Sequence, residues 1–206
     1  GIVYGGTKIE GILINDKGEE ILRKRSGYEK NYESGVNTIK NLVEEFDKHT
    51  NSKSSVGVGI PGSSSKENGL IKNANSIWLN GKPFKKDLEM SLDREIKIMN
   101  DANCFALSEA IDGSGANYNT VWGVIIGSGF GGSFVHNKKV VEGVNQVAGD
   151  WGHQPLPYPS KEEWDLNLKC PVDNCGRPLC AEQFISVIGF TNIFNIKYKT
   201  NFTTKE

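Results

Sequence analysis

The sequence has no excess of either charge and no long apolar run, and both absences exclude classes of function. Its 206 residues include 24 basic and 25 acidic side chains, well mixed, for a formal net charge of −1. That balance provides no basic surface for nucleic acid. The longest apolar stretches, such as residues 121–126, are far too short to span a bilayer. We therefore expect neither a nucleic-acid partner nor a membrane partner.

The sequence also lacks an internal repeat, a low-complexity tract and a recognisable secretory signal. Cysteine is scarce, with four residues, but three of them lie between positions 170 and 180. Clustered thiols suited to a metal are typical of a reducing compartment, so we expect the cytoplasm. There is no initiator Met, and residues 192–206 become polar without a helix stop or a closing strand. We therefore expect a fragment, at least at the C-terminal end.

The stretch from 148 to 182 combines His153 with Cys170, Cys175 and Cys180. Thiolates and one imidazole are the ligand set of a tetrahedral structural zinc, and such a site would hold a segment that has little apolar periodicity. A disulfide with one spare thiol, or chance clustering, are the alternatives. The flanking Gly and Pro residues and the odd number of thiols favour zinc.

Apolar periodicity predicts strands that alternate with helices, which is typical of an α/β fold with a mixed sheet. Residues 31–50 have a 3.6-residue apolar stripe, and residues 54–62 have the pattern of a buried strand that runs into a Gly-Ile-Pro-Gly bend. Strands are predicted within 1–13, 19–25, 54–62, 95–101, 121–126 and 133–137, and helices at 31–50, 82–93 and 102–111.

Two strand pairs enclose glycine-rich bends, at residues 5–8 (GGTK) and at residues 127–132 (GSGFGG). Backbone N–H groups in such a bend can approach an anion closely, because no Cβ obstructs it. Each bend alone is weak evidence, since glycine-rich turns are usually only turns. The repetition of the pattern suggests two halves that each offer a phosphate-holding hairpin to one cleft.

Asp101 lies where a predicted strand ends and a predicted helix begins. Because α/β ligand sites collect at the carboxyl ends of strands, it is a candidate base facing a cleft. An ordinary helix cap is the alternative. Asn73, Asn75 and Trp78 follow another predicted strand and suit either a sugar or ordinary turns.

Seven stretches together resemble the ROK family of sugar kinases, most closely its bacterial fructokinases. They run in family order over nearly the whole chain, and the third and sixth are long and specific. The stretches are GGTK (5–8), VGVGIPGS (56–63), KNANSIWLNGKPF (72–84), NDANCFALSEA (100–110), VIIGSGFGG (124–132), DWGHQPLPY (150–158) and CGRPLCAEQFIS (175–186).

The resemblance implies an actin-like ATPase (ribonuclease-H-like) fold of two domains with a cleft, which we place at residues 1–117 and 118–206. Family members are longer, so the second domain is expected to be incomplete and this form inactive. ATP with Mg²⁺ is expected to phosphorylate a hexose, with fructose the predicted substrate, in a protein that is a homodimer at full length. The alternatives are a non-catalytic sugar-binding or sensor protein, or an inactive fragment of a ROK kinase.

Carried over by position, the resemblance implies that Asp101 is the catalytic base. His153 would place one ring nitrogen on zinc and the other on the sugar. The residues implied to bind the sugar are Gly62, Asn75, Asn100, Asp150, His153 and Glu182. Those implied to hold the ATP phosphates are Gly5, Gly6, Thr7, Lys8, Gly127, Ser128, Gly129 and Gly131.

Four features depart from the family pattern, among them Ser133, which replaces a small Gly or Ala near the second glycine-rich bend. Val3 stands where the family has an Asp that helps to arrange metal and phosphates, and Val cannot ligate a metal. Asp150 replaces a Glu that is one methylene longer. In the zinc segment a family cysteine is replaced by Asp173, and we expect Cys170 to be the ligand instead, with Asp173 as the alternative.

Overall fold

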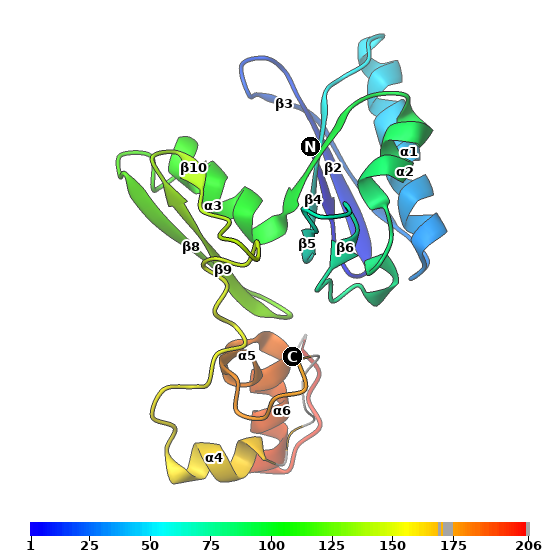
Figure 1. Cartoon of the computed structure of the whole chain (residues 1–206). Helices are drawn as coiled ribbons and strands as arrows, with labels where there is room; N and C mark the ends of the chain where they lie inside the picture. Colours follow the sequence, from blue (N-terminus) through cyan, green and yellow to red (C-terminus); the bar gives the residue numbers. More distant parts are fainter. Residues whose placement is uncertain (169, 171–174, 205–206) are drawn as a thin grey trace. The chain divides into compact units, whose positions relative to one another are not determined.

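A computed structural model of the chain describes residues 1–168, 170 and 175–204. By contacts the chain forms two compact units, Gly1–Cys104 and Phe105–Glu206, which are described separately below (Figure 1). Most of helix α3 (Asp101–Ile111) belongs with the strands that follow it. The sequence-based division after residue 117 therefore remains a proposal.

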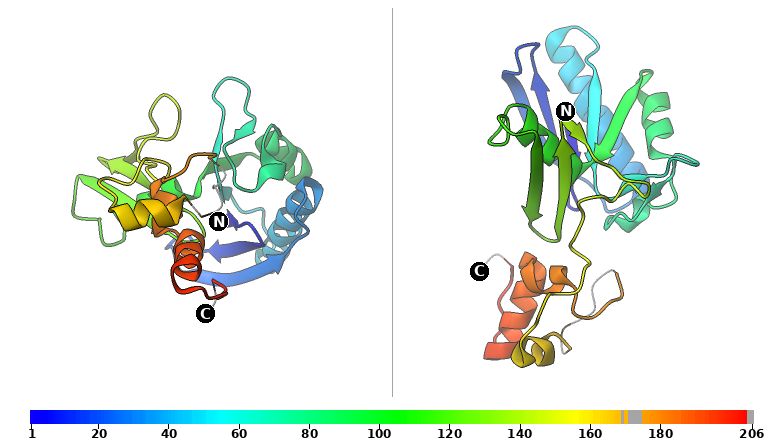
Figure 2. Two further views of the ribbon diagram at one scale, coloured as in Figure 1. Left: turned by 90° about the horizontal axis from the view of Figure 1, so that it is seen from below. Right: turned by 60° about the vertical axis from the view of Figure 1, so that its left-hand side comes forward.

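The first unit contains a five-stranded mixed sheet in the order β3-β2-β1-β4-β7 (Figure 2). Strand β1 pairs antiparallel with β2 and parallel with β4, and β4 pairs parallel with β7. The predicted strand pair around the GGTK turn and the predicted mixed sheet are confirmed. The strands are β1 (Ile2–Tyr4), β2 (Lys8–Ile14), β3 (Glu20–Gly27), β4 (Val56–Ile60) and β7 (Ile96–Asn100).

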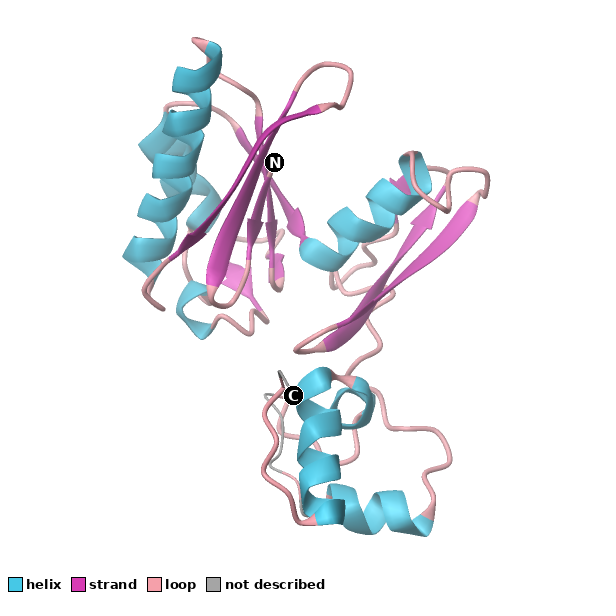
Figure 3. Cartoon of the chain, turned by 180° about the vertical axis from the view of Figure 1, so that it is seen from behind, coloured by secondary structure: helices cyan, strands magenta, loops and turns pink. Residues whose placement is uncertain are grey.

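Helices α1 (Tyr32–Thr50) and α2 (Phe84–Leu92) pack on one face of this sheet (Figure 3). The predicted stripe of α1 forms the contact, with Ile39 and Phe46 almost fully buried. The helix begins at Asn31, whose side chain accepts a hydrogen bond from Ser34 N at 2.8 Å. The remaining short elements are β5 (Ser63–Ser64), β6 (Ile71–Lys72) and the 3₁₀ turn η1 (Ile77–Leu79).

On the other face of the sheet, strand pairing places one residue from each strand side by side in a row. Arg25 of β3 pairs with Glu10 of β2, and Glu10 pairs with Val3 of β1. The row continues through Gly59 of β4 to Met99 of β7. Because side chains alternate along a strand, these residues lie opposite the apolar core, and Val3 is 53% exposed.

The second unit contains an antiparallel sheet in the order β10-β9-β8, with α3 against it. Ala106 and Ala110 of α3 pack with Val135 of β9. A Cβ on Gly123 of β8 would lie 2.6 Å from the Ala106 Cβ, so this close approach requires glycine. The predicted strands are confirmed as β8 (Thr120–Ile126) and β9 (Phe130–His136), followed by β10 (Lys139–Val140).

Three further helices of the second unit differ from the sequence-based expectation, which treated residues 148–182 as loop and the end as polar. They are α4 (Lys161–Asn167), α5 (Ala181–Ile185) and α6 (Val187–Tyr198). Ser160 and Glu163 form a capping box that starts α4. Helix α6 ends at Lys199, whose φ of 53° is left-handed. No helix in the described part of the chain is long and apolar enough to cross a membrane.

Candidate active site

The turn between β1 and β2 is closed by its own backbone. Gly5 N donates to Lys8 O at 3.0 Å, and a Cβ on Gly5 would lie only 2.7 Å from that oxygen. A Cβ on Gly6 would meet nothing within 4 Å, so the backbone there is open to an approaching group. The turn is therefore closed by its backbone and open beside Gly6, and its phosphate-holding role stays a prediction.

A hollow of about 380 Å³ lies beside this turn and is lined by Val3, Gly5, Thr7, Lys8, Glu10 and Arg25. The Glu10 carboxylate accepts from Arg23 Nη1 at 2.8 Å and is ion-paired with Arg25. The hydrogen bond from Arg23, then that from Arg25, lowers the pKa of Glu10. Because two guanidinium groups neutralise this carboxylate and Lys8 adds a further cation, the hollow favours an anion such as phosphate.

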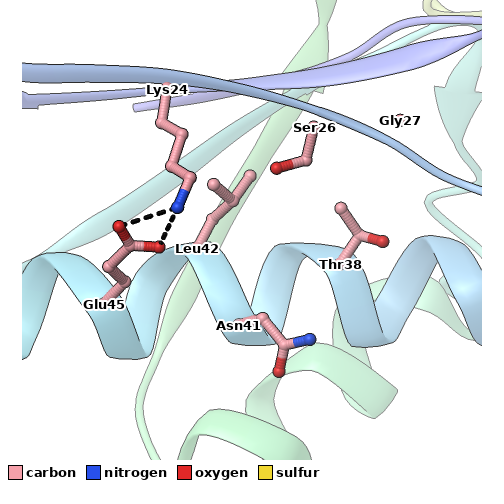
Figure 4. A pocket seen from close by; sticks show the side chains of 7 residues that line it. All are labelled: Lys24, Ser26, Gly27, Thr38, Asn41, Leu42 and Glu45. Atoms are coloured by element: carbon pink, nitrogen blue, oxygen red, sulfur yellow. Dashed lines mark hydrogen bonds and ion pairs between the residues drawn. The ribbon is translucent and has the colours of Figure 1, made fainter.

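A second hollow, of about 260 Å³, lies between β3 and α1 (Figure 4). Lys24 Nζ lies 2.6 Å from a carboxylate oxygen of Glu45, and the buried Leu42 forms part of the lining. Its lining residues come from outside the predicted site. We therefore assign it no role in the proposed function.

Gly62 and Asn100 come together at the carboxyl ends of β4 and β7. Asn100 Nδ2 donates to Gly62 O at 3.0 Å. The φ of Gly62 is 74°, and a Cβ there would lie 2.4 Å from Lys72 O and 2.7 Å from Ala74 N. Only glycine fits this close approach between two segments that both contain predicted sugar-binding residues.

The segment that carries Asn75 is fixed by Asn80, a residue that the sequence analysis did not single out. Asn80 Oδ1 accepts from Ala74 N, and Asn80 Nδ2 donates to Ala74 O, both at 2.9 Å. Asn75 is the next residue and is exposed. This pair of hydrogen bonds between the Asn80 side chain and the Ala74 backbone holds the backbone next to Asn75 in place. An Asn six residues beyond a turn gives no distinctive sequence signal, which is why it was missed.

Asp101 is the first residue of α3, directly after β7, as predicted. The helix cap is Asn100, whose Oδ1 accepts from Asn103 N at 3.1 Å. Asp101 Oδ1 accepts from Ala102 N at 2.8 Å. Burial, and then the charge of Asp101, raises the pKa of Cys104. Asn100 therefore occupies the cap position, and Asp101 also accepts an N–H of the first turn, so both interpretations of Asp101 stay open.

In the second unit the bend at residues 127–132 is held by Glu182. Gly127 N donates to Gly129 O at 2.9 Å, and Phe130 N donates to Glu182 Oε2 at 2.9 Å. Val187 N donates to Gly127 O at 2.9 Å. The N-terminal ends of α5 and α6 therefore anchor the predicted phosphate bend, and the predicted sugar residue Glu182 lies against it.

Residues 150–152 lie along the same bend. Glu182 N donates to Gly152 O at 2.8 Å, and a Cβ on Gly152 would lie 1.7 Å from Phe130 O, so this position requires glycine. A Cβ on Gly131 would lie 3.3 Å from Asp150 Oδ1. The predicted residues Asp150, Glu182 and Gly131 are thus neighbours within one unit.

The structure brings together three of the four predicted zinc ligands. The ligand atoms of His153, Cys175 and Cys180 all lie within 4.8 Å of one another. Zinc binds such donors at about 2.1–2.3 Å, so a small contraction gives one ion three protein ligands. Cys170 lies outside this group, and its Sγ contacts Leu166 O at 3.6 Å. Cys170 therefore stays a prediction.

The cluster is supported by a buried residue that the sequence analysis missed. Asn167 is 1% exposed, and its Oδ1 accepts from Leu179 N at 2.8 Å, next to Cys180. The backbone of Cys180 also forms an isolated antiparallel β-bridge with Pro155, which lies two residues after His153. The alternative ligand Asp173 lies outside the described residues.

The predicted site residues are divided between the two units. The first unit holds Gly5, Gly6, Thr7, Lys8, Gly62, Asn75, Asn100 and Asp101. The second holds Gly127, Ser128, Gly129, Gly131, Asp150, His153, Glu182 and the thiols. Each unit therefore contains one glycine-rich bend together with predicted sugar-binding side chains.

Solved structures have the same fold. The ROK hexokinase from Thermus thermophilus matches with a TM-score of 0.79 and 22% identity over 100% of this chain and 66% of its own. A ROK family glucokinase from Streptomyces griseus, solved with glucose and AMPPNP, matches with a TM-score of 0.76 and 24% identity over 93% of this chain and 58% of its own. The fold is therefore the actin-like ATPase (ribonuclease-H-like) fold.

A model of the ROK family matches residues 1–205, and the chain belongs to the ROK family. The N-acetyl-D-glucosamine kinase of Haemophilus influenzae (strain 86-028NP) is 39% identical over 197 residues, which are 94% of this chain and 64% of that protein. The chain thus spans about two thirds of the length of this curated relative. The family prediction is confirmed, whereas the fructokinase branch stays a prediction.

Proposed function

We propose that the whole protein transfers a phosphoryl group from ATP to a hydroxyl of a hexose. The observation that carries this proposal is the arrangement in the first unit. Asn100 ends β7 and Asp101 follows it, the Asn100 side-chain amide holds Gly62 at the end of β4, and the closed Gly5–Lys8 turn follows β1 in the same sheet. These residues lie at the carboxyl ends of parallel strands, which is where α/β sheets bind their ligands.

Asp101 is the proposed base that accepts the proton of the attacking hydroxyl. Its position at the start of α3 favours the ionised carboxylate, because the helix dipole is positive there. Asn100, Gly62 and Asn75 would position the sugar. In phosphoryl transfer most of the rate comes from alignment and charge neutralisation, so the rigid backbone around these residues matters as much as the base.

The phosphates of ATP are proposed to lie on the two glycine-rich bends. In the first unit these are Gly5, Gly6, Thr7 and Lys8, beside the cationic hollow. In the second unit these are Gly127, Ser128, Gly129 and Gly131. Mg²⁺ would neutralise charge on the transferred group. The carboxylate in the hollow is Glu10, which is already paired with two arginines.

In the second unit Asp150, His153 and Glu182 are the proposed sugar-binding residues. A structural zinc on His153, Cys175 and Cys180 would fix the orientation of the His153 ring. Cys170 is the proposed fourth ligand. The donor set of one imidazole and thiolates fits zinc better than magnesium.

The acceptor sugar has two candidates. The motifs NANSIWLNG and DWGHQPLPY resemble fructokinases, which favours fructose. The relative from Haemophilus influenzae is named an N-acetyl-D-glucosamine kinase, which favours that sugar. We propose fructose as the first candidate and N-acetylglucosamine as the second. A homodimer and a cytoplasmic location remain predictions for the whole protein.

A coupled assay of ADP release with a panel of hexoses tests the proposal. We expect release that depends on both ATP and a hexose, with the highest kcat/KM for one of the two named sugars. Release that is independent of sugar would contradict it.

A sugar sensor is the second candidate function, because Val3 offers only apolar surface in the phosphate hollow. Hexose binding measured by calorimetry, without any ADP release, would favour the sensor.

A further inference from the structure

Three aromatic side chains of the first unit, Tyr4, Tyr28 and Trp78, contact one another and are called the aromatic group below. Trp78 Nε1 donates to Tyr4 Oη at 2.9 Å, and Tyr28 Oη donates to the carbonyl oxygen of Gly5 at 2.9 Å. The rings of Tyr4 and Tyr28 pack edge to face, with their centroids 5.2 Å apart.

An indole N–H can only donate, so Tyr4 Oη accepts from Trp78. Burial raises the pKa of Tyr4 far above its usual range, so its hydroxyl stays protonated. The Tyr28 hydroxyl donates to the carbonyl oxygen of Gly5. Two hydrogen bonds and one edge-to-face ring contact therefore lead from Trp78 to the Gly5 carbonyl.

The surrounding structure makes room for these hydroxyls. Tyr4 is 1% exposed, and a Cβ on Gly35 of α1 would lie 2.2 Å from Tyr4 Oη. Phe84 of α2 packs edge-on against the Tyr4 ring, with centroids 5.6 Å apart. Close packing on all sides holds these side chains in one arrangement.

The aromatic group contacts the proposed phosphate turn at one end and the proposed sugar-binding segment at the other. Gly5 belongs to the phosphate turn, and its own N–H closes that turn onto Lys8 O. Trp78 belongs to η1, three residues after Asn75, in the segment that Asn80 holds. The two hydrogen bonds and the ring contact between Tyr4 and Tyr28 thus connect the proposed phosphate segment with the proposed sugar segment.

We propose that Tyr4, Tyr28 and Trp78 are positioning residues that couple the sugar segment to the phosphate turn. A phosphate group on the turn and a hexose on the segment then strengthen the binding of each other. The inference rests on the proposed function of both segments. Coupling between two sites is reciprocal by thermodynamic necessity.

The test measures the Kd of fructose and of N-acetylglucosamine for the chain by calorimetry, with and without saturating inorganic tripolyphosphate. We expect tripolyphosphate to tighten hexose binding by about fivefold or more. Tyr28→Phe removes one hydroxyl and keeps the ring. It should bring this ratio close to one, while the Kd of the hexose alone changes by less than about twofold, because the sugar contacts remain.

Tyr32→Phe is the matched control. The Tyr32 hydroxyl donates to Asp87 Oδ2 at 2.6 Å, and the Tyr32 ring packs on Phe84. Tyr32 therefore lies near the aromatic group, but its hydroxyl takes no part in the contacts from Trp78 to Gly5. This variant should keep the wild-type ratio. The indole N–H resonance of Trp78 should move on addition of tripolyphosphate in the wild type and in Tyr32→Phe, but not in Tyr28→Phe.

Three results would overturn the inference. Wild-type chain that binds both ligands with a ratio of one would refute the coupling and leave the proposed function intact. A Tyr28→Phe ratio equal to that of the wild type, with or without a lower Tm, would show that Tyr28 is only structural. Wild-type chain that binds neither hexose would overturn both the coupling and the proposed sugar site.

Discussion

Replacing Glu182 should loosen the glycine-rich bend between β8 and β9. The Glu182 carboxylate accepts the N–H of Phe130 at 2.9 Å, and Phe130 is 4% exposed, so water cannot readily take its place. A Cβ on Gly129 would lie 3.0 Å from the same carboxylate oxygen, so the backbone of the bend packs closely against the Glu182 carboxylate. The side chain therefore has a structural role besides its proposed contact with the sugar.

The size of the effect follows from this one hydrogen bond. A hydrogen bond to a charged group contributes about 1.5–3 kcal/mol, and a buried donor left without a partner costs about the same. Glu182→Ala should therefore lower the free energy of unfolding of the second unit by about 2–3 kcal/mol. Glu182→Gln keeps an amide oxygen as acceptor, so its cost should be about 1 kcal/mol.

Urea denaturation and amide hydrogen exchange measure these effects. The Phe130 amide should exchange roughly 30- to 150-fold faster in Glu182→Ala, the factor that corresponds to about 2–3 kcal/mol. Glu162→Ala is the matched control, because Glu162 pairs with Lys197 at 2.8 Å on the exposed surface. That pair should contribute less than about 1 kcal/mol. Equal costs for the two variants, with unchanged exchange at Phe130, would refute the reasoning.

Three further predictions concern the metal, a glycine and the phosphate hollow. Protein purified without chelator should contain about one zinc per chain by mass spectrometry, and Cys175→Ser should release it; metal-free wild type would contradict this. Gly62→Ala should lower the free energy of unfolding by about 2 kcal/mol or more, because of its φ of 74° and the Lys72 oxygen, whereas Gly57→Ala, with open space around its Cβ, should cost less than half as much; equal costs would contradict it. Val3→Asp should raise the phosphorylation rate of the active whole protein about tenfold, or about 1.4 kcal/mol, without changing hexose affinity; an unchanged rate would refute the assigned role.

Local patterns in the sequence were enough to predict most of the fold. The stripe that includes Ile39 and Phe46 predicted α1, because a helix with one apolar face must bury it. The short α4 was not predicted although Ser160 and Glu163 form a capping box, because its 7 residues are too few for a clear apolar stripe. Helix α6 was missed because its polar end obscured the four-residue spacing of Phe190, Phe194 and Tyr198.

The site could be predicted only where its signal is local. Asp101 follows directly from a strand that meets a helix. The bond between Trp78 and Tyr4 joins residues 74 positions apart, and that between Phe130 and Glu182 joins residues 52 positions apart. No spacing rule connects such pairs, because tertiary packing brings them together.

The proposed reaction is tested most directly by ³¹P NMR of the whole protein with ATP, Mg²⁺ and a hexose. We predict that a hexose monophosphate resonance grows as the γ-phosphate resonance of ATP declines. Asp101→Asn should slow this by orders of magnitude while calorimetry still detects hexose binding, because Asn keeps the shape but cannot accept the proton. A phosphorylated sugar formed at the same rate by Asp101→Asn, or none formed by the wild type, would contradict the account.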